Sequence, residues 1–208
     1  MVLVIDYGIG NLASFAKALA HLPVPFTVSA NPDDLQVGRR VVLIGVGNFA
    51  SAMQELRRRG LEDALRRFLA EPDARLVGIC VGMQLLFEGS EEAPGVAGLG
   101  LFPGIVKKLV PQAEAPVPHV GFDEIRFDRP SQMTRGLPDR TAFYFTHSFA
   151  VMQPPPGCWA ASCMHGATPF IAAVDDGKVC GMQFHPEKSQ SNGLTMLRNL
   201  LMRDEVEG

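Results

Sequence analysis

The stretch Leu76-Val77-Gly78-Ile79-Cys80-Val81-Gly82-Met83-Gln84-Leu85-Leu86-Phe87 decides how this chain folds. It opens as a short apolar run, which predicts a buried strand, and it ends with Met83, Leu86 and Phe87 at helical spacing. Between them lies Gly78-x-Cys80-x-Gly82, the pattern of a nucleophile elbow with a cysteine in place of a serine. The glycines allow a sharp turn from strand to helix, and a helix N-terminus favours the reactive thiolate. We therefore predict that Cys80 is a nucleophile and that the Val81 N–H faces a developing oxyanion. The alternative is a buried cysteine in a glycine-containing turn.

The composition is that of a globular protein without a nucleic-acid surface. The chain has 208 residues, of which 47% are hydrophobic and 20% are charged, and its net charge is −3. No apolar run reaches membrane-spanning length, and the first residues lack the basic start of a signal peptide. The four cysteines contain no Cys-x-x-Cys pair and are too few for a disulfide framework. We expect a single domain over residues 1–208, a cytoplasmic location and no metal site.

Apolar runs and helical stripes alternate along the first half of the chain. Runs at 2–5, 41–44 and 76–79 predict strands, and helical patterns follow at 12–22, 50–59 and 61–71. Because these strands are apolar on both faces, they predict a parallel sheet that helices cover on both sides. The pattern Gly8-x-Gly10-x-x-Ala13 matches a dinucleotide-binding turn only weakly, so we interpret it as a tight turn with Asn11 as the helix N-cap.

The second half of the chain changes character, because prolines and glycines are frequent and the apolar runs are short. Candidate strands lie at 104–110, 120–127, 142–149, 158–164, 169–174 and 179–184, and a last amphipathic helix follows. We find no linker or repeat between the halves. The predicted fold is therefore α/β, with an open, mostly parallel central sheet flanked by helices and an antiparallel extension of that sheet.

A second chemical motif is His185-Pro186-Glu187, directly after an apolar run. Pro186 lacks an N–H and disfavours α geometry at His185, so we predict an extended tripeptide with the side chains of His185 and Glu187 on one face. Glu187 would then orient the imidazole of His185 and leave its other nitrogen for a thiol. Alone, the motif is also compatible with a surface turn that carries an ordinary histidine.

Together the two motifs resemble a known family. Gly-x-Cys-x-Gly-x-Gln followed by a distal Phe-His-Pro-Glu is similar to the class I (triad) glutamine amidotransferases, a resemblance that implies a flavodoxin-like fold. The closer resemblance is to the glutaminase subunit of imidazole glycerol phosphate synthase. It covers the segments 6–11, 78–84, 89–95, 118–122, 144–149 and 185–189. Two positions depart from that pattern, since Ile44 stands where the family usually has proline and Phe122 where it usually has tryptophan.

The resemblance implies a function and a set of site residues. The chain would hydrolyse L-glutamine to glutamate and ammonia without a cofactor. The ammonia would pass to a separate (β/α)₈-barrel cyclase subunit, as a heterodimer, which forms imidazole glycerol phosphate and AICAR in histidine biosynthesis. The expected residues are Cys80, His185 and Glu187 for catalysis; Val46, Gly47 and Val81 for the oxyanion; Gly45, Gln84, His147, Ser148 and Phe149 for the substrate; and Asn11, His119, Phe122 and Lys188 for the partner interface.

Other functions remain open from the sequence. The chain could be the glutaminase subunit of another synthase, for pyridoxal phosphate or anthranilate, a non-catalytic binding relative on the same fold, or a cysteine peptidase or redox protein. One expectation concerns regulation. Glycines flank Val46, so its peptide could flip and withdraw an oxyanion donor until a partner binds. Ile44 constrains the backbone less than proline would, and we expect a higher basal activity in consequence.

Overall fold

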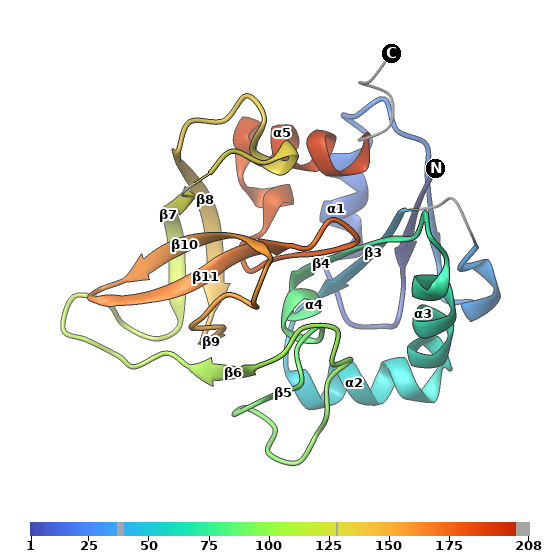
Figure 1. Ribbon diagram of the computed structural model, residues 1–208, viewed down its shortest axis with the longest axis horizontal. Helices are drawn as coiled ribbons and strands as arrows, with labels where there is room; N and C mark the ends of the chain where they lie inside the picture. Colours follow the sequence, from blue (N-terminus) through green and yellow to red (C-terminus); the bar gives the residue numbers. More distant parts are fainter. Residues whose placement is uncertain (37–39, 128, 203–208) are drawn as a thin grey trace.

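A nine-stranded mixed sheet organises the computed structural model, which describes residues 1–36, 40–127 and 129–202 (Figure 1). The strand order is β2-β1-β3-β4-β12-β11-β10-β7-β8. These strands are β1 (Val2–Ile5), β2 (Phe26–Ser29), β3 (Arg40–Gly45), β4 (Arg75–Cys80), β7 (His119–Phe127), β8 (Arg140–His147), β10 (Trp159–His165), β11 (Thr168–Asp175) and β12 (Val179–Met182). A small second sheet contains β5 (Gly89–Ser90), β6 (Ile105–Lys108) and β9 (Phe149–Ala150).

The large sheet is parallel in one half and antiparallel in the other, as the sequence predicts. Strands β2, β1, β3, β4 and β12 are parallel neighbours, whereas β12, β11, β10, β7 and β8 pair antiparallel. In the parallel half Gly45 is paired with Cys80 and Met182 with Ile79. The carboxyl ends of β3, β4 and β12 therefore meet at one edge of the sheet, where open α/β folds bind their ligands.

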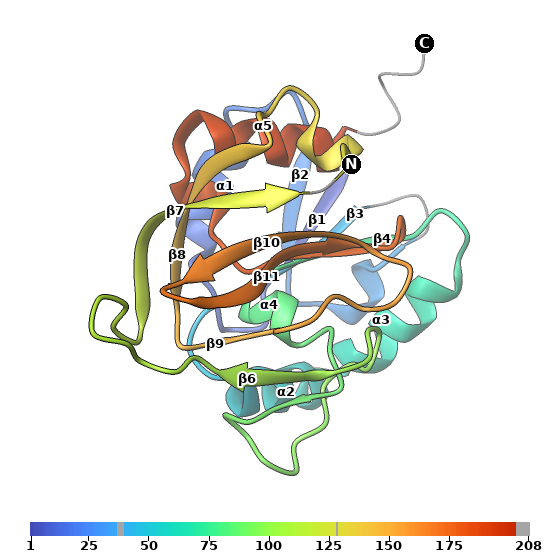
Figure 2. The same cartoon turned by 60° about the vertical axis from the view of Figure 1, so that its left-hand side comes forward.

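Helices cover both faces of the parallel half. The helices are α1 (Leu12–Leu19), α2 (Phe49–Arg58), α3 (Leu61–Ala70), α4 (Val81–Gln84) and α5 (Gln190–Leu201), with 3₁₀ turns η1 (Pro32–Asp34), η2 (Gln132–Thr134) and η3 (Pro186–Lys188). Helices α1 and α5 lie on one side of the sheet, and α2 and α3 lie on the other (Figures 1 and 2). Along α2, Phe49, Ala52, Met53 and Leu56 are buried at the spacing of a single helical face. Within the described ranges, none of these helices is long and apolar enough to cross a membrane.

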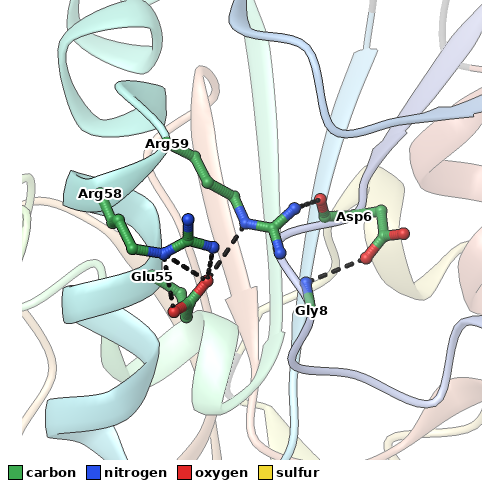
Figure 3. A network of polar contacts seen from close by, with 5 residues as sticks. All are labelled: Asp6, Gly8, Glu55, Arg58 and Arg59. Carbon is green, nitrogen blue, oxygen red and sulfur yellow. Dashed lines mark hydrogen bonds and ion pairs between the residues drawn. The ribbon is translucent and has the colours of Figure 1, made fainter.

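The glycine-rich turn after β1 is a tight structural turn, as predicted. Asn11 caps α1 by accepting a hydrogen bond from the Ser14 N–H at 3.3 Å. Gly8 has a φ of 82° and donates its N–H to Asp6 Oδ1 at 2.9 Å. Arg59, at the end of α2, donates to the carbonyl of Asp6 and also pairs with Glu55 (Figure 3). This network fixes the loop beside the end of β3 and so supports one border of the site.

The helix after the elbow is shorter than predicted. Helix α4 contains only four residues, because the carbonyls of Leu85, Leu86 and Phe87 do not continue it. They accept hydrogen bonds instead from the backbone of 99–102, and all three side chains are fully buried. Their apolar spacing therefore reflects a buried loop crossing, which periodicity alone does not distinguish from a helix.

Candidate active site

The elbow holds Cys80 in a strained conformation. Its φ of 54° and ψ of −113° are unusual for a residue with a Cβ. The flanking glycines make this turn possible: a Cβ on Gly78 would lie 2.6 Å from the carbonyl oxygen of Gly82, and a Cβ on Gly82 would overlap that of Leu43. The side chain of Cys80 is buried, with 4% exposure. Such strain at a buried cysteine is typical of a nucleophile that the fold holds in place.

His185 and Glu187 form the predicted pair, although the tripeptide is not extended as predicted. His185 is extended, but Pro186–Lys188 forms the 3₁₀ turn η3, with the Lys188 N–H donating to the His185 carbonyl at 3.1 Å. Proline suits the first position of such a turn because its fixed φ is close to helical. The turn, rather than a shared strand face, brings Glu187 Oε1 to 2.7 Å from His185 Nδ1. Both side chains are 1% exposed.

This pair controls the protonation of His185. Burial acts to lower its pKa, but interactions with Cys80 and Glu187 outweigh burial and raise the pKa to about 9. Its Nε2 atom is buried and has no hydrogen-bond partner among the described residues. Nδ1 donates to Glu187, so Nε2 is the nitrogen left to exchange a proton with a thiol or a leaving group.

A cavity of about 320 Å³ opens over Cys80. It is lined by Val46, Gly47, Cys80, Val81, Gln84, Glu92, Pro118, Thr146, His147, Ser148, Phe149 and His185. Most of the residues expected to touch an oxyanion or a substrate therefore lie around one space. Two expected residues do not line it: Glu187 lies behind His185, and Gly45 lies at the end of β3.

The end of β3 and the loop after it form one border of the cavity and contain two glycines with different roles. A Cβ on Gly45 would lie 2.7 Å from the hydroxyl of Tyr7 and 2.8 Å from the Gly82 nitrogen, so glycine is needed there for close packing. Gly47 instead has a φ of 94°, and no atom lies within 4 Å of where its Cβ would be. The loop has room on that side. The predicted flip of the Val46 peptide stays a prediction.

Sequence reasoning missed two polar groups of the site, the partly exposed Glu92 and the buried Gln183. Glu92 lines the cavity, and its Oε2 accepts a hydrogen bond from the Phe49 N–H at 2.8 Å. Gln183 is fully buried and donates to Cys80 Sγ, with an N–S distance of 3.8 Å. A signal existed for Gln183, because it is the only polar side chain in the apolar run 179–184. Glu92 lies in the segment 89–95 that carried the resemblance, but nothing in that segment singles out one carboxylate.

The four residues expected at a partner interface differ in exposure. Phe122 is 50% exposed and contacts the ring of Tyr144 edge-on, and the Lys188 ammonium lies 5.4 Å from the centre of the same ring. This surface group, Phe122–Tyr144–Lys188, adjoins the cavity, because Tyr144 lies two residues from the lining residue Thr146 on β8. Asn11 is exposed and caps α1.

The side chain of His119 is only 7% exposed in the lone chain, and its expected place at a partner interface stays a prediction. Its ring is stacked on Phe145, and its nitrogens face His147 Nε2 at 3.1 Å and Asp123 Oδ2 at 3.0 Å. Burial lowers the pKa of His119 and lowers that of His147 to about 3. Through its contact with His147, His119 therefore supports the cavity wall from behind.

Comparisons with known proteins agree with this geometry. The family profile described as glutamine amidotransferase class-I matches residues 3–203. The chain belongs to the class I glutamine amidotransferase family. The amidotransferase is 43% identical to the imidazole glycerol phosphate synthase subunit HisH of Moorella thermoacetica, over 95% of this chain and 92% of that one. It is 44% identical to HisH of Methylococcus capsulatus, over 96% and 95% of the two chains.

Solved structures show the same fold. A crystal structure of a glutamine amidotransferase covers 96% of this amidotransferase and 99% of its own chain, with a TM-score of 0.71 and 19% identity. The structure of PurLQS from Thermotoga maritima covers 97% of each chain with a TM-score of 0.71 and 15% identity. At such identities the likeness concerns the fold alone. The assignment of this amidotransferase to the HisH type rests on its sequence relatives.

Proposed function

We propose that this chain, as one glutaminase domain, hydrolyses L-glutamine through Cys80, His185 and Glu187 and supplies the ammonia to a cyclase subunit of imidazole glycerol phosphate synthase. The observation that carries the proposal is the cavity over Cys80, which the unpartnered Nε2 side of His185 also reaches. Cys80 lies on an elbow and His185 is held by a buried carboxylate. These are the components of an activated nucleophile.

The chemistry follows from the order of proton transfers. The proton that Cys80 gives up resides on His185 Nε2, in agreement with the raised pKa of His185, and the resulting thiolate attacks the side-chain amide carbon of glutamine. We assign the oxyanion to the N–H groups of Val81 and of the Val46–Gly47 loop, because these residues line the cavity. The imidazolium then gives its proton to the departing ammonia, and neutral His185 activates water to hydrolyse the thioester to glutamate.

The far end of the cavity suits the amino-acid end of glutamine. Gln84 donates from Nε2 to both the Phe149 carbonyl and Gln183 Oε1, which leaves its Oε1 as an acceptor for the substrate. Glu92 supplies a carboxylate for the α-ammonium group. The backbone at His147–Phe149 is the remaining part of the wall, and we assign it to the α-carboxylate.

We propose that a partner chain covers the exposed surface beside the cavity. Ammonia is mostly protonated near neutral pH and is then not nucleophilic, so it needs a sheltered route to its acceptor. The Phe122–Tyr144–Lys188 group offers exposed aromatic area and a cation next to the cavity. The sequence relatives are named as subunits of a synthase. We therefore place the cyclase on this surface, with Asn11 at its border.

The decisive experiment measures glutamate release by the purified chain with its cyclase partner and compares wild type with Cys80→Ser and Cys158→Ser. We expect Cys80→Ser to lose essentially all activity and Cys158→Ser, which changes a cysteine outside the cavity, to retain it. A glutamine-like electrophile should label Cys80 alone among the four cysteines. Equal labelling of Cys158 would contradict the nucleophile assignment.

The same preparation separates the alternatives. If the chain served pyridoxal phosphate or anthranilate formation, a different synthase partner, and not the cyclase, would use the ammonia. A non-catalytic relative would release no glutamate with any partner. The HisH similarity and the complete set of chemical groups favour the cyclase assignment.

A further inference from the structure

Among the residues that the structure describes, Gln183 is the side-chain amide that lies against the sulfur of Cys80. It follows β12 directly, is fully buried, and is held by two polar contacts of its side chain. Its Nε2 lies 3.8 Å from Cys80 Sγ, and its Oε1 lies 3.1 Å from Gln84 Nε2. Neither the triad nor the substrate contacts proposed above use this residue.

The orientation of the Gln183 amide is determined by a backbone carbonyl two hydrogen bonds away. The carbonyl of Phe149 can only accept hydrogen bonds, and it does so from His147 Nδ1 at 3.0 Å and Gln84 Nε2 at 2.9 Å. The amide of Gln84 must therefore present its NH₂ group to Phe149. The second N–H of that group meets Gln183, so Gln183 must offer its oxygen to Gln84 and its NH₂ group to the sulfur.

Besides His185, the sulfur of Cys80 has two contacts, each suited to a different one of its protonation states. The carbonyl of Thr146, 4.0 Å away, can accept a hydrogen bond from the thiol but has nothing to donate to a thiolate. The Gln183 N–H has the opposite preference, because a donor interacts more strongly with a charged acceptor than with a neutral one. When the thiol proton leaves, the contact with Gln183 becomes the stronger of the two.

We propose that Gln183 is a further catalytic residue, which stabilises the Cys80 thiolate by an N–H···S⁻ hydrogen bond, and that Gln84 is the positioning residue that orients it. The inference rests on the proposed role of Cys80 as the nucleophile. The proton moves from Sγ to His185 Nε2, and the electron pair left on sulfur accepts from Gln183. The contact weakens when that pair forms the bond to the amide carbon, and it returns when water releases glutamate and the thiolate leaves.

The test is the pH dependence of Cys80 alkylation by iodoacetamide in the full chain, with alkylation followed site by site by mass spectrometry. We expect Gln183→Met to raise the midpoint of the profile, so that alkylation well below the midpoint is slower by roughly tenfold, with an unchanged rate at high pH. Gln183→Glu keeps an acceptor toward Gln84 but removes the donor from the sulfur, and should raise the midpoint further. Met182→Leu, at the neighbouring buried position, is the control for packing and should leave the profile unchanged.

Each outcome bears on the inference. A Gln183→Met profile that overlays the wild type overturns it, and so does an equal shift in Met182→Leu, which would make the effect one of packing. Gln183→Glu conserves size and decides the question should Gln183→Met fail to fold. Retained glutamine hydrolysis by Cys80→Ser would defeat the proposed function itself, which distinguishes the two failures.

Discussion

At the scale of single residues, the site depends on where each proton resides. His185 keeps its proton because a buried carboxylate and the Cys80 sulfur outweigh the cost of burial, whereas His147, without a carboxylate of its own, is held neutral. Two buried histidines that line one cavity therefore have pKa values on opposite sides of neutral pH. This separation assigns proton transfer to His185 and leaves His147 as a fixed part of the wall.

The raised pKa of His185 predicts a stability change in alkaline solution. In the folded protein the pKa of His185 is about 9, whereas the ordinary pKa of a histidine is 6.5. The stabilisation from this group is complete below 6.5 and is lost as the pH rises from there through about 9. Denaturant unfolding of wild type against His185→Gln should show a difference in slope of up to about 1.4 kcal/mol per pH unit in that window.

His21→Gln is the control for this measurement, since His21 is an exposed histidine outside the cavity. It should follow the wild-type curve. Parallel curves for wild type and His185→Gln across the window would show that the pair with Glu187 does not hold the proton.

At the scale of elements, the turn η3 carries Glu187, the acid of the proposed triad, and packs against helix α5. A Cβ on Gly193, in the first part of α5, would overlap the carbonyl oxygen of Pro186. The Asn192 amide also donates to the carbonyl of Ala142 at 3.1 Å, and the Ser189 hydroxyl accepts from the Tyr144 N–H. The start of α5, η3 and β8 therefore form one packed unit around His185 and Glu187.

This packing predicts the effect of one added methyl group. Alanine in place of glycine usually stabilises a helix interior by about 1 kcal/mol, but Gly193→Ala should destabilise by roughly 1–3 kcal/mol because the backbone must shift. It should also lower glutamine hydrolysis by displacing Glu187. Ser191→Ala, on the exposed side of the same helix, should leave both unchanged. Full activity and unchanged stability in Gly193→Ala would show that α5 and η3 move independently.

At the scale of the whole molecule, the cavity lies where the parallel and antiparallel halves of the sheet meet. The parallel half supplies Cys80 at the end of β4, and the antiparallel half supplies Thr146 and His147 at the end of β8. The Phe122–Tyr144–Lys188 group belongs to the second half and lies beside the cavity on β7, β8 and η3. A partner that binds there would act on one wall of the cavity while the nucleophile stays in place.

This arrangement predicts that coupling can be lost without loss of the nucleophile. Lys188→Ala should reduce glutamine-dependent product formation by the complex while a glutamine-like electrophile still labels Cys80. Lys178→Ala is the control, because Lys178 precedes β12 at the opposite edge of the sheet. We expect it to retain wild-type coupling. Unchanged use of glutamine nitrogen by the Lys188→Ala complex would remove this surface from the proposed interface.

The sequence alone determined the fold class and the chemical types of the site. Gly78-x-Cys80-x-Gly82 was sufficient for the elbow, because only glycine tolerates such close backbone contacts there. The change from uninterrupted apolar runs to short strands was sufficient to predict a parallel half and an antiparallel half of the sheet, since strands that are buried on both faces have uninterrupted apolar runs. The His185–Glu187 contact was predicted correctly, but through the wrong local geometry.

Only the tertiary structure decided the length of α4, the burial of His119 and the positions of Glu92 and Gln183. Helix α4 ends because the backbone N–H groups of the loop 99–102 donate to the carbonyls that follow it. The end of the helix therefore depends on residues that are more distant in sequence. His119 and Gln183 acquired their positions through partners that tertiary packing brings together. For His119 these are Asp123 on the same strand and His147 on β8, and for Gln183 they are Cys80 at the end of β4 and Gln84 in α4. Local patterns record which face of an element is apolar, but the partner of a buried polar group depends on how distant segments pack, and that is settled only when the chain folds.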